Sequence, residues 1–434
     1  MSSNHPQIYM QDSRTGQSYS IEVHDNALQA SDLKQIKVGR GPGLKVFDEG
    51  LVNTATLRSG LTYQDGQKGV LLFRGHSIDR LWNCNFEEIL HLTLWSRLPN
   101  GHEKETLRKR IALEMTNVPD AVIKAIHAIP STCPPVPMVL AGLSAYLADK
   151  PEKIPAFMGG NIYHGNEHEI DTAPIRTAAA WAVCIGIAIS HRKGITFTPA
   201  SVDRTYFENL FRMMGHVDQS THEPDPNKLG CFGKFGALSV DHGMTSSTFA
   251  LLVTCSTLAD PLSGMISSLA TGYGPLHFGA PESAYKTMQS IGKPENVPAL
   301  IEKVKRGEQR LFGYGHRSYE VPDPRIKPIQ TLLEQLNAKE NPLLAVAQEI
   351  DRLASQDEYF KKRGIQANAD LYGVFFYIAE GFSPEQIPLL MMTHRLPGIL
   401  AHWRDAMQRP IKVIRPSHIY EGDTEIGLNP SFKL

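Results

Sequence analysis

Histidine, arginine and aspartate residues gather in glycine- and proline-rich segments of the second half of the chain. The segments are Asp241-His242-Gly243, Gly274-Pro275-Leu276-His277-Phe278-Gly279, Gly313-Tyr314-Gly315-His316, Asp323-Pro324-Arg325, Asn368-Ala369-Asp370, His394-Arg395 and Arg415-Pro416. Glycine lets the backbone approach a ligand closely, and proline restrains the path of a loop. A single histidine in a turn is usually structural, but together these segments supply a base, imidazoles and fixed cations. That combination suits carbanion chemistry on an anionic substrate.

Two other segments have the outline of a binding site. Residues 164–168, His-Gly-Asn-Glu-His, place two histidines four positions apart, as in some zinc sites. Gly165 and Asn166 disfavour a helix there, and zinc would need a third ligand at a defined distance, so we expect a polar loop and no metal. Residues 39–43, Gly-Arg-Gly-Pro-Gly, lack the Lys-Ser/Thr end of a phosphate loop, and we expect a flexible loop there.

The composition argues against several classes of protein. The chain has 434 residues, with 44 basic and 45 acidic side chains and a net charge of −1, so nucleic acid is not an expected partner. The longest apolar run, 178–190, is shorter than the roughly 18 residues that a membrane span needs, so we expect no membrane partner either. An apolar content of 41% suits a buried core, and the length predicts at least two domains.

The cysteines and the chain ends favour a reducing compartment. Five cysteines are scattered and form no Cys-x-x-Cys pair, so neither a zinc site nor a disulfide framework is indicated. Cys184 and Cys255 lie in apolar helical blocks, which predicts core positions rather than nucleophiles. The first residues show no signal core or Arg-rich transit segment, and Phe432-Lys433-Leu434 departs from the Ser-Lys-Leu address. We therefore expect a cytoplasmic protein.

The elements that must position the chemical groups are mostly helices. Strands are predicted near the N-terminus, at 7–10 and 18–23 around one turn and at 61–63 and 70–73 around another. From residue 77 the apolar spacing becomes helical. Helical blocks are predicted at 103–115, 137–148, 175–192, 203–214, 245–257, 297–306, 341–354 and 384–403. The pattern predicts a mainly α fold with a small N-terminal β element, and hinges at 272–281 and 382–384.

The sequence resembles the citrate synthase family over essentially its full length. Residues 44–55 and the Arg-Gly-x-x-Ile turn at 74–78 are similar to the family's opening β region. Further on, five blocks occur in the family's order: Gly-Pro-Leu-His at 274–277, Gly-His-Arg-x-Tyr at 315–319, Asp-Pro-Arg at 323–325, an Asp with an aromatic at the second following position at 370–372, and Arg-Pro at 415–416. Each block is weak alone, but five in order at matching intervals are strong evidence.

The resemblance implies a two-domain helical fold. The large domain would comprise residues 1–278 and 386–434, with its β region at about 1–75. The small domain, 279–385, would carry a loop that binds coenzyme A and a catalytic aspartate. The resemblance also implies a homodimer.

The reaction implied is the condensation of an acyl-CoA with oxaloacetate, followed by hydrolysis of the thioester. Asp370 would remove the proton α to the thioester carbonyl, because that proton is too weakly acidic to leave unaided. His277 would donate a hydrogen bond to the thioester oxygen as it becomes enol-like. His316 would polarise and then protonate the ketone of oxaloacetate, and His242 would hold that substrate from the other side.

Three arginines would clamp the two carboxylates of oxaloacetate, since guanidinium groups pair carboxylates bidentately and stay charged. These are Arg325, Arg395 and Arg415, the last supplied by the neighbouring subunit. The loop of Phe312, Gly313, Tyr314 and Gly315 would lie against coenzyme A. Coenzyme A would enter as the thioester substrate, with no tightly bound cofactor.

Several departures from the family pattern fall near the expected position of the acyl thioester. The family usually has a glutamate where this chain has Gly243, followed here by Met244, and a glycine where this chain has Phe278. Leu371 replaces a phenylalanine, Ser239 a histidine, and Glu320 an often basic residue. A larger, less polar pocket would favour acyl chains longer than acetyl, by roughly 0.8 kcal/mol per buried methylene. Gly243, Met244, Phe278 and Leu371 are therefore candidates for the acyl pocket.

This pattern resembles fungal alkylcitrate synthases, which condense medium-chain acyl-CoA with oxaloacetate, and implies a role in secondary metabolism. An ordinary citrate synthase or a 2-methylcitrate synthase is the nearer alternative, in which Phe278 merely changes the packing. A non-catalytic acyl-CoA-binding protein on the same fold is the more distant alternative. Loss of Asp370, His277 or His316 would mark that alternative, and all three are present.

Overall fold

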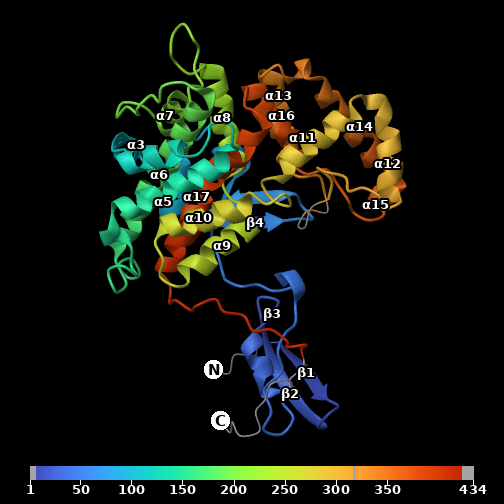
Figure 1. Cartoon of the computed structure of the whole chain (residues 1–434). Helices are drawn as coiled ribbons and strands as arrows, with labels where there is room; N and C mark the ends of the chain where they lie inside the picture. Colours follow the sequence, from blue (N-terminus) through green and yellow to red (C-terminus); the bar gives the residue numbers. More distant parts are fainter. Residues whose placement is uncertain (1–5, 316–318, 320, 423–434) are drawn as a thin grey trace. The chain divides into compact units, whose positions relative to one another are not determined.

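The computed structural model describes residues 6–315, 319 and 321–422, and the chain divides into two compact units, residues 1–60 and 61–434. The first unit contains an antiparallel sheet of β1 (Gln7–Asp12), β2 (Gln17–His24) and β3 (Ala27–Leu28) (Figure 1). In β1 and β2, Asp12 pairs with Gln17 and Gln7 with Glu22, so the hairpin predicted from this sequence is confirmed. Two short 3₁₀ helices, Ala30–Gln35 and Glu49–Leu51, follow.

The second unit begins with the other predicted hairpin. Its strands β4 (Thr62–Asp65) and β5 (Val70–Phe73) pair antiparallel, and β6 (His76–Ser77) adds a short third strand. Arg74, in the turn after β5, donates hydrogen bonds to the carbonyl oxygen of Thr93 and, at 2.9 Å, to the carboxylate of Asp405. The Arg-Gly turn noted in the sequence thus fastens the sheet to two helices.

Helices make up the rest of the second unit, as the sequence predicts (Figure 1). The first group is α1 (Ile78–Leu81), α2 (Phe86–Trp95), α3 (Gly101–Thr116), α4 (Asp120–His127), α5 (Pro135–Asp149), α6 (Glu167–Lys193), α7 (Tyr206–Met213), α8 (Pro226–Leu238), α9 (Ser246–Cys255) and α10 (Pro261–Gly272). The second group is α11 (Ala280–Ile291), α12 (Val297–Lys305), α13 (Ile326–Gln335), α14 (Pro342–Gln356), α15 (Glu358–Lys361) and α16 (Asp370–Glu380). The chain then returns through α17 (Ile387–Met407).

The core of the second unit is built on α6. This helix is long and apolar enough to span a membrane by length and composition alone, a possibility that the shorter run 178–190 did not suggest. However, 89% of its apolar window is buried inside the protein, as expected for a core helix. Trp181 is fully buried and donates a hydrogen bond of 2.9 Å to Thr393 of α17. Cys184 on α6 and Cys255 on α9 are buried, as predicted.

The segment 164–168 differs from the polar loop that we expected. Asn166 is the N-cap of α6, and its side chain accepts a hydrogen bond from the backbone nitrogen of Glu169. His168 is therefore helical whereas His164 precedes the helix, and His164 contacts the carbonyl oxygen of Arg409 instead. Asparagine disfavours helix interiors for the same reason that it suits this cap, because its side chain competes for backbone groups. The described residues contain no cluster of three or more metal-ligating side chains.

Helix α17 carries the predicted Arg395 and packs closely on the segment before His242. A Cβ atom at Gly398 would lie 2.3 Å from the carbonyl oxygen of Val240 and 2.7 Å from Cβ of Asp241. The backbone nitrogen of Gly398 donates a hydrogen bond of 3.2 Å to the same Val240 oxygen. Glycine is thus required here by close approach of two backbones.

The two predicted hinges fall between helices. Residues 273–279 connect α10 to α11, and residues 381–386 connect α16 to α17 through a 3₁₀ turn at Pro384–Gln386. Helices α11, α12, α13, α14 and α16 contact one another, and α13 also contacts α8. A division of the helical unit at 278 and 385 stays a prediction.

We expect Gly398→Ala to lower the free energy of unfolding by about 1–3 kcal/mol, because the added methyl group would push apart two backbones that cannot yield independently. Urea unfolding followed by circular dichroism measures this change. Gly230→Ala in α8 is the matched control, since a Cβ there meets nothing within 4 Å and alanine favours a helix. Equal stability of the Gly398→Ala variant and the wild type would contradict the close packing.

Candidate active site

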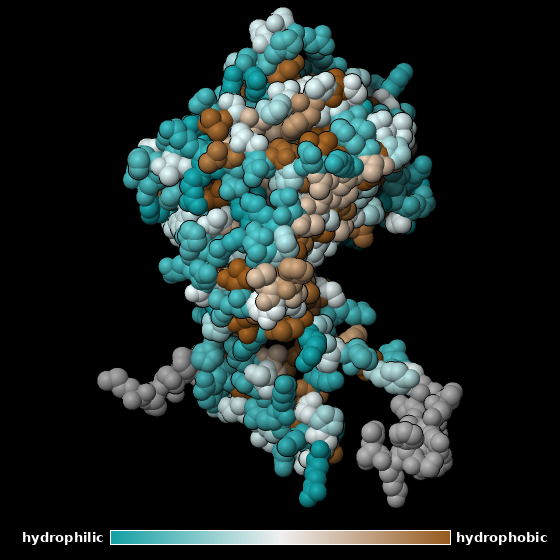
Figure 2. Space-filling view, turned by 60° about the vertical axis from the view of Figure 1, so that its left-hand side comes forward, coloured by the Kyte–Doolittle hydropathy of each residue, from teal (hydrophilic) through white to brown (hydrophobic). Residues whose placement is uncertain are grey.

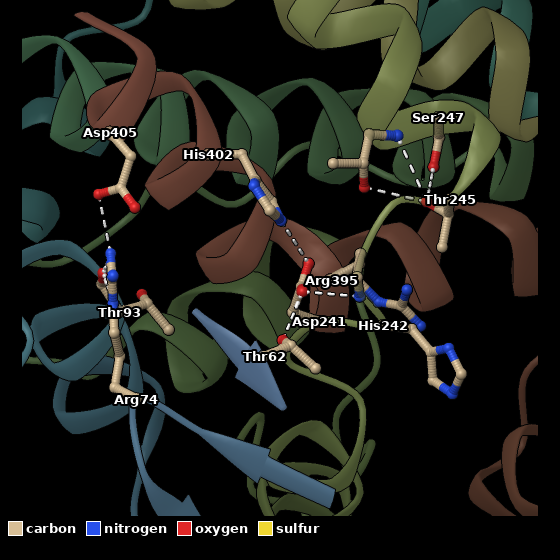
Figure 3. Close-up of polar contacts among 12 residues, drawn as sticks. Thr62, Arg74, Thr93, Asp241, His242, Thr245, Ser247, Arg395, His402 and Asp405 are labelled. Atoms are coloured by element: carbon tan, nitrogen blue, oxygen red, sulfur yellow. Dashed lines mark hydrogen bonds and ion pairs between the residues drawn. The ribbon is translucent and has the colours of Figure 1, made fainter. Parts of the chain in front are cut away.

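A buried carboxylate organises the segment that carries His242. Asp241 is fully buried, and its side chain accepts hydrogen bonds from Thr62 of β4, at 2.5 Å, and from the backbone nitrogen of Gly243, at 2.9 Å (Figure 3). Its other oxygen lies 3.2 Å from Nε2 of His402 on α17. Burial by itself would raise the pKa of Asp241, but His402, Arg395 and Thr62 together lower it to about 2. The carboxylate is therefore charged, and it joins β4, the 240s segment and α17.

His242 lies next to this carboxylate, and Nδ1 of its ring is 3.1 Å from the side-chain nitrogen of Gln64. The following residue, Gly243, has a φ of 67°, in the left-handed region that favours glycine. A Cβ there would meet nothing within 4 Å, so the requirement is conformational. Glycine, which stands here in place of the family's usual glutamate, adopts this turn easily.

His277 lies in the connection between α10 and α11, and it contacts the first turn of α9. Its Nε2 is 2.8 Å from the hydroxyl oxygen of Ser247. That hydroxyl oxygen is in turn 3.1 Å from Oγ1 of Thr245, the N-cap of α9 (Figure 3). The ring stacks on Phe278, with centroids 4.2 Å apart. Burial, and to a smaller extent Arg395, lower the pKa of His277 to about 4. The imidazole is therefore neutral at pH 7, when it can donate a hydrogen bond from one nitrogen.

Arg395 is a buried cation with an unused donor. It is 6% exposed, and its Nε donates a hydrogen bond of 2.9 Å to the carbonyl oxygen of Ser239. Its Nη1 is buried and has no hydrogen-bond partner among the described residues. Burial lowers the pKa of Arg395 to about 10, opposed by Asp241, so the group stays charged at neutral pH. An orphaned buried N–H group costs about 1–3 kcal/mol unless a ligand accepts from it.

Arg325 and Asp370 are joined through Asp323. The Asp323 carboxylate accepts hydrogen bonds from Arg325, at 2.9 and 2.6 Å, and one of 3.2 Å from the backbone nitrogen of Ala369. Although burial opposes the charge of Arg325, Asp323 raises its pKa above the ordinary value. Asp323 thereby fixes the guanidinium of Arg325 beside the start of α16, where Asp370 is the first residue.

Asp370 retains access to solvent and lies in a pocket with both arginines. Desolvation by the surrounding protein raises the pKa of Asp370, with Arg325 and Arg395 opposing the shift and Asp323 adding to it. The pocket and the solvent space at its mouth together measure about 470 Å³. Its lining includes the charged Arg325, Asp370 and Arg395, the hydroxyl-bearing Ser239 and Tyr377, and otherwise apolar residues. A base with a raised pKa next to two fixed cations suits proton removal beside an anionic substrate.

The predicted coenzyme A loop is fastened to the segment that leads into α16. Gly313 accepts a hydrogen bond from the backbone nitrogen of Asn368, whose side chain bridges the carbonyl oxygen of Gly315 and the backbone nitrogen of Asp370. Gly313 has a φ of 74°, and a Cβ there would lie 2.7 Å from Cα of Leu371. The loop and the carboxylate of Asp370 are thus positioned by the same residues.

The side chains of this loop differ in accessibility. Tyr314 is buried, and its hydroxyl donates a hydrogen bond of 2.6 Å to Asp351 of α14. Phe312 is half-buried. The contact of this loop with coenzyme A stays a prediction, and any contact from residue 314 would come from its backbone.

None of the four acyl-pocket candidates lines the pocket that contains Asp370, and their role stays a prediction. Phe278 is buried against Gly272, and Leu371 is fully buried against Gly313. Met244 is 39% exposed, and neither it nor Gly243 lines the pocket that contains Asp370.

Of the other predicted residues, one is exposed and one cannot be placed. Arg415 is exposed in the segment that follows α17, and it does not line the pocket of its own chain. His316 lies outside the described residues, as does Glu320. The structure therefore gathers three of the predicted residues in one pocket: Arg325, Arg395 and Asp370. His277 is near enough to Arg395 for that charge to lower its pKa, and His242 lies in the turn that Asp241 fixes.

Residue-by-residue reading of the sequence missed the supporting groups. Asp241 and Asp323 were noted beside His242 and Arg325, but no role was predicted for either carboxylate. Ser247 and His402 were not noted at all. Available signals were the Asp-x-Arg spacing of 323–325, which suits a local ion pair, and a serine within the first turn of a helix.

The charge of Asp241 predicts a pH-dependent difference between the wild type and Asp241→Asn. The folded-state pKa of about 2 lies below the unfolded value of about 3.9, so the carboxylate stabilises the fold above pH 4 and this contribution is lost as the pH falls toward 2. We expect the wild type to be more stable at pH 5, and the difference to narrow by about 1 kcal/mol at pH 3. Urea unfolding at both pH values checks this; a difference independent of pH would contradict the assigned charge.

Comparisons with known proteins agree with this geometry. The family model described as "Citrate synthase, C-terminal domain" matches residues 50–417. Alkylcitrate synthase phiJ of a fungal species is 43% identical over 429 residues, which cover 96% of this chain and 94% of that protein. Alkylcitrate synthase tstJ of Talaromyces stipitatus is 43% identical over 423 residues, covering 96% and 95%.

Solved structures give the same result for the fold. Citrate synthase of Thermoplasma acidophilum, in a ternary complex with carboxymethyl coenzyme A and oxaloacetate, superposes with a TM-score of 0.79 at 25% identity, covering 89% of this chain and 99% of that one. Citrate synthase of Pyrobaculum aerophilum superposes with a TM-score of 0.79 at 26% identity, covering 88% and 94%. The mainly α fold with small sheets near the N-terminus is thus confirmed, and the chain belongs to the citrate synthase family.

Proposed function

We propose that the protein is an alkylcitrate synthase, an acyltransferase that condenses a medium-chain acyl-CoA with oxaloacetate and hydrolyses the resulting thioester. The observation that carries the proposal is the convergence of Asp370, Arg325 and Arg395 on one pocket with an apolar remainder. The two curated alkylcitrate synthases at 43% identity support it. The cytoplasmic location and the role in secondary metabolism stay predictions.

In this mechanism oxaloacetate binds first to the cations. Arg395 has a buried N–H group that no other residue described by the structure accepts from, and Arg325 is held in place by Asp323. Each guanidinium pairs a carboxylate of oxaloacetate bidentately. By accepting from the unpaired N–H group of Arg395, oxaloacetate offsets the free-energy cost of burying that group. His242, positioned by the turn at Asp241, holds the substrate from the other side.

Carbon–carbon bond formation then uses the base. Asp370 removes the proton on the carbon α to the thioester, and neutral His277 donates a hydrogen bond to the thioester oxygen as negative charge develops on it. The α-carbon forms a bond to the ketone carbon of oxaloacetate, and the ketone oxygen takes a proton from His316. Water then attacks the thioester, and coenzyme A leaves as the thiol while the acid is released.

A panel of acyl-CoA thioesters from acetyl to decanoyl tests the proposal. We expect thiol release that depends on oxaloacetate and is fastest for chains of six carbons or more, because each buried methylene favours binding by roughly 0.8 kcal/mol. A preference for acetyl or propionyl would make the protein a citrate or 2-methylcitrate synthase. No release that depends on oxaloacetate, from any thioester, would favour a non-catalytic acyl-CoA-binding protein.

Asp370→Asn tests the assignment of the base in the same assay. We expect a loss of about 10²–10⁴-fold in kcat, the usual contribution of a positioned base, with oxaloacetate binding measured by calorimetry nearly unchanged. Near wild-type turnover in this variant would show that another group removes the proton. Loss of oxaloacetate binding would instead indicate that the variant disturbs the arginines.

We also propose a homodimer in which Arg415 reaches the partner's active site. Arg415 is exposed and does not line the pocket of its own chain. Figure 2 shows apolar patches among polar regions on one face of the molecule, and exposed apolar side chains of the second unit include Leu276 (84%) and Phe157 (72%). Apolar surface of this kind favours association with another protein surface.

Mixed dimers distinguish action within a subunit from action across the interface. Coexpressed Asp370→Asn and Arg415→Ala chains form heterodimers. If Arg415 acts across the interface, one of the two sites in a heterodimer has both native residues. If Arg415 acts within its own chain, each site lacks one of them. We then expect about a quarter of the wild-type activity, because half of the dimers are mixed and each has one intact site. Activity no higher than that of either single variant would place Arg415 in the site of its own chain.

A further inference from the structure

The pocket at Asp370 has a polar end and an apolar end that are one helical turn apart. Arg325, the N-cap of α13, lines the polar end, and Ile329, four residues on in α13, lines the apolar remainder. On α17, Arg395 lies four residues after Met391, which also lines the pocket. Residues four apart share a helix face, so each helix presents a charged group and an apolar group to the same space.

Helix α16 repeats this arrangement, and α8 adds an apolar ring. On α16, Asp370 shares its face with Gly373 and Val374, which come one turn later, and all three line the pocket. On α8, the ring of Phe235 lines it, at 6% exposure. Val374 and Ile329 are almost completely buried at 1% exposure each, so the apolar end lies inside the protein while Asp370 remains accessible.

The apolar end suits only one part of the proposed substrates. Oxaloacetate is a dianion, and its carboxylates need donors that Ile329, Val374 and Phe235 do not have. The pantetheine arm of coenzyme A carries amides with the same requirement. Two hydroxyl-bearing side chains line the pocket. Ser239 lies beside Arg395, which donates to its carbonyl oxygen, and the hydroxyl of Tyr377 contacts Nδ1 of His394 at 2.9 Å. An alkyl chain is the part that needs no hydrogen bonds.

The position of Asp370 also restricts where the chain goes. A base that removes the α-proton lies within hydrogen-bond reach of that carbon's proton. The alkyl substituent is attached to the same carbon, so its first methylenes must lie next to the carboxylate. Gly373 and Val374, one turn along α16 from Asp370, line the same pocket and are apolar.

We propose that the alkyl tail of the acyl-CoA extends from Asp370 into this apolar end, and that Gly373 sets how long a tail it accepts. The inference rests on the function proposed above. Gly373 faces Phe235 across the pocket: a Cβ there would be 3.6 Å from Cζ of that ring, ordinary van der Waals contact. Any larger side chain at 373 occupies the space between the two, and so shortens the pocket. Phe235 is held by stacking on Phe376, with centroids 4.1 Å apart, and does not move aside freely.

The test is the ratio of kcat/KM for octanoyl-CoA to that for acetyl-CoA in Gly373→Leu and in the wild type. Each methylene excluded lowers kcat/KM for the longer substrate about fourfold, so exclusion of three methylenes lowers the ratio about 60-fold. Gly373→Ala, which fits in contact with Phe235, should lower the ratio by less than tenfold. Thermal unfolding confirms that each variant is folded.

Gly230→Leu on α8 is the matched control, because it adds the same side chain at an exposed helical position with nothing within 4 Å. The inference holds if the ratio falls in Gly373→Leu and not in Gly230→Leu. It is overturned if the wild type prefers long chains and Gly373→Leu keeps that preference. Phe278→Ala then tests the alternative pocket beside His277. If the wild type releases no thiol in a way that depends on oxaloacetate, the proposed function itself fails. That outcome is distinguishable from the two outcomes that concern the octanoyl-to-acetyl ratio.

Discussion

A buried guanidinium that keeps its charge is the constraint on which the site depends. Arg395 is 6% exposed, and burial pulls its pKa down to about 10, so the fold must supply compensating charge. Asp241 provides part of it, and Asp241 is itself kept ionised by His402 and Thr62. These contacts require α17, β4 and the 240s segment to meet closely, and Gly398 permits that approach. Within the part of the chain that the structure describes, one donor of Arg395 is nevertheless left without a partner. A binding site for an anion has such a donor, whereas in a structural ion pair every buried donor is satisfied.

Coupling between the base and the second cation follows the same logic. Asp323 accepts from Arg325 and from the backbone at the start of α16, so the position of the guanidinium and that of Asp370 cannot vary independently. Asn368 adds a link to the loop at Gly313–Gly315. Hydrogen bonds between segments 46 and 53 residues apart in the chain thus arrange the cation, the base and the loop before any substrate binds. This arrangement lowers the entropic cost of assembling them in the transition state.

The charged residues of the site could be predicted from the sequence, whereas most of the residues that position them could not. Asp370, Arg325 and Arg395 stood out because they lie in short blocks with glycine and proline, and both hairpins followed from turn residues between apolar runs. The supports were missed because they act across the fold: Ser247 meets His277 thirty residues away, and Thr62 meets Asp241 across 179. The beginning of α6 was misjudged since Asn166 disfavours helix interiors but caps helix starts. Periodicity could not show that Gly373 faces Phe235, because that contact depends on how α16 packs on α8.

A substrate with a charged head and an apolar tail needs two environments within a few ångströms, and helix periodicity provides them. Since residues four apart share a face, a helix that points a charged group into the pocket places its neighbour one turn away against the tail. Arg325 with Ile329, and Asp370 with Val374, follow this rule. Substitution at the apolar member changes volume without removing a charge, and a change of one methylene alters affinity by roughly 0.8 kcal/mol. Substitution of the charged residue of such a pair removes a group that binds the substrate or takes part in the reaction. Preference for chain length can therefore change within this architecture while the condensation itself is retained.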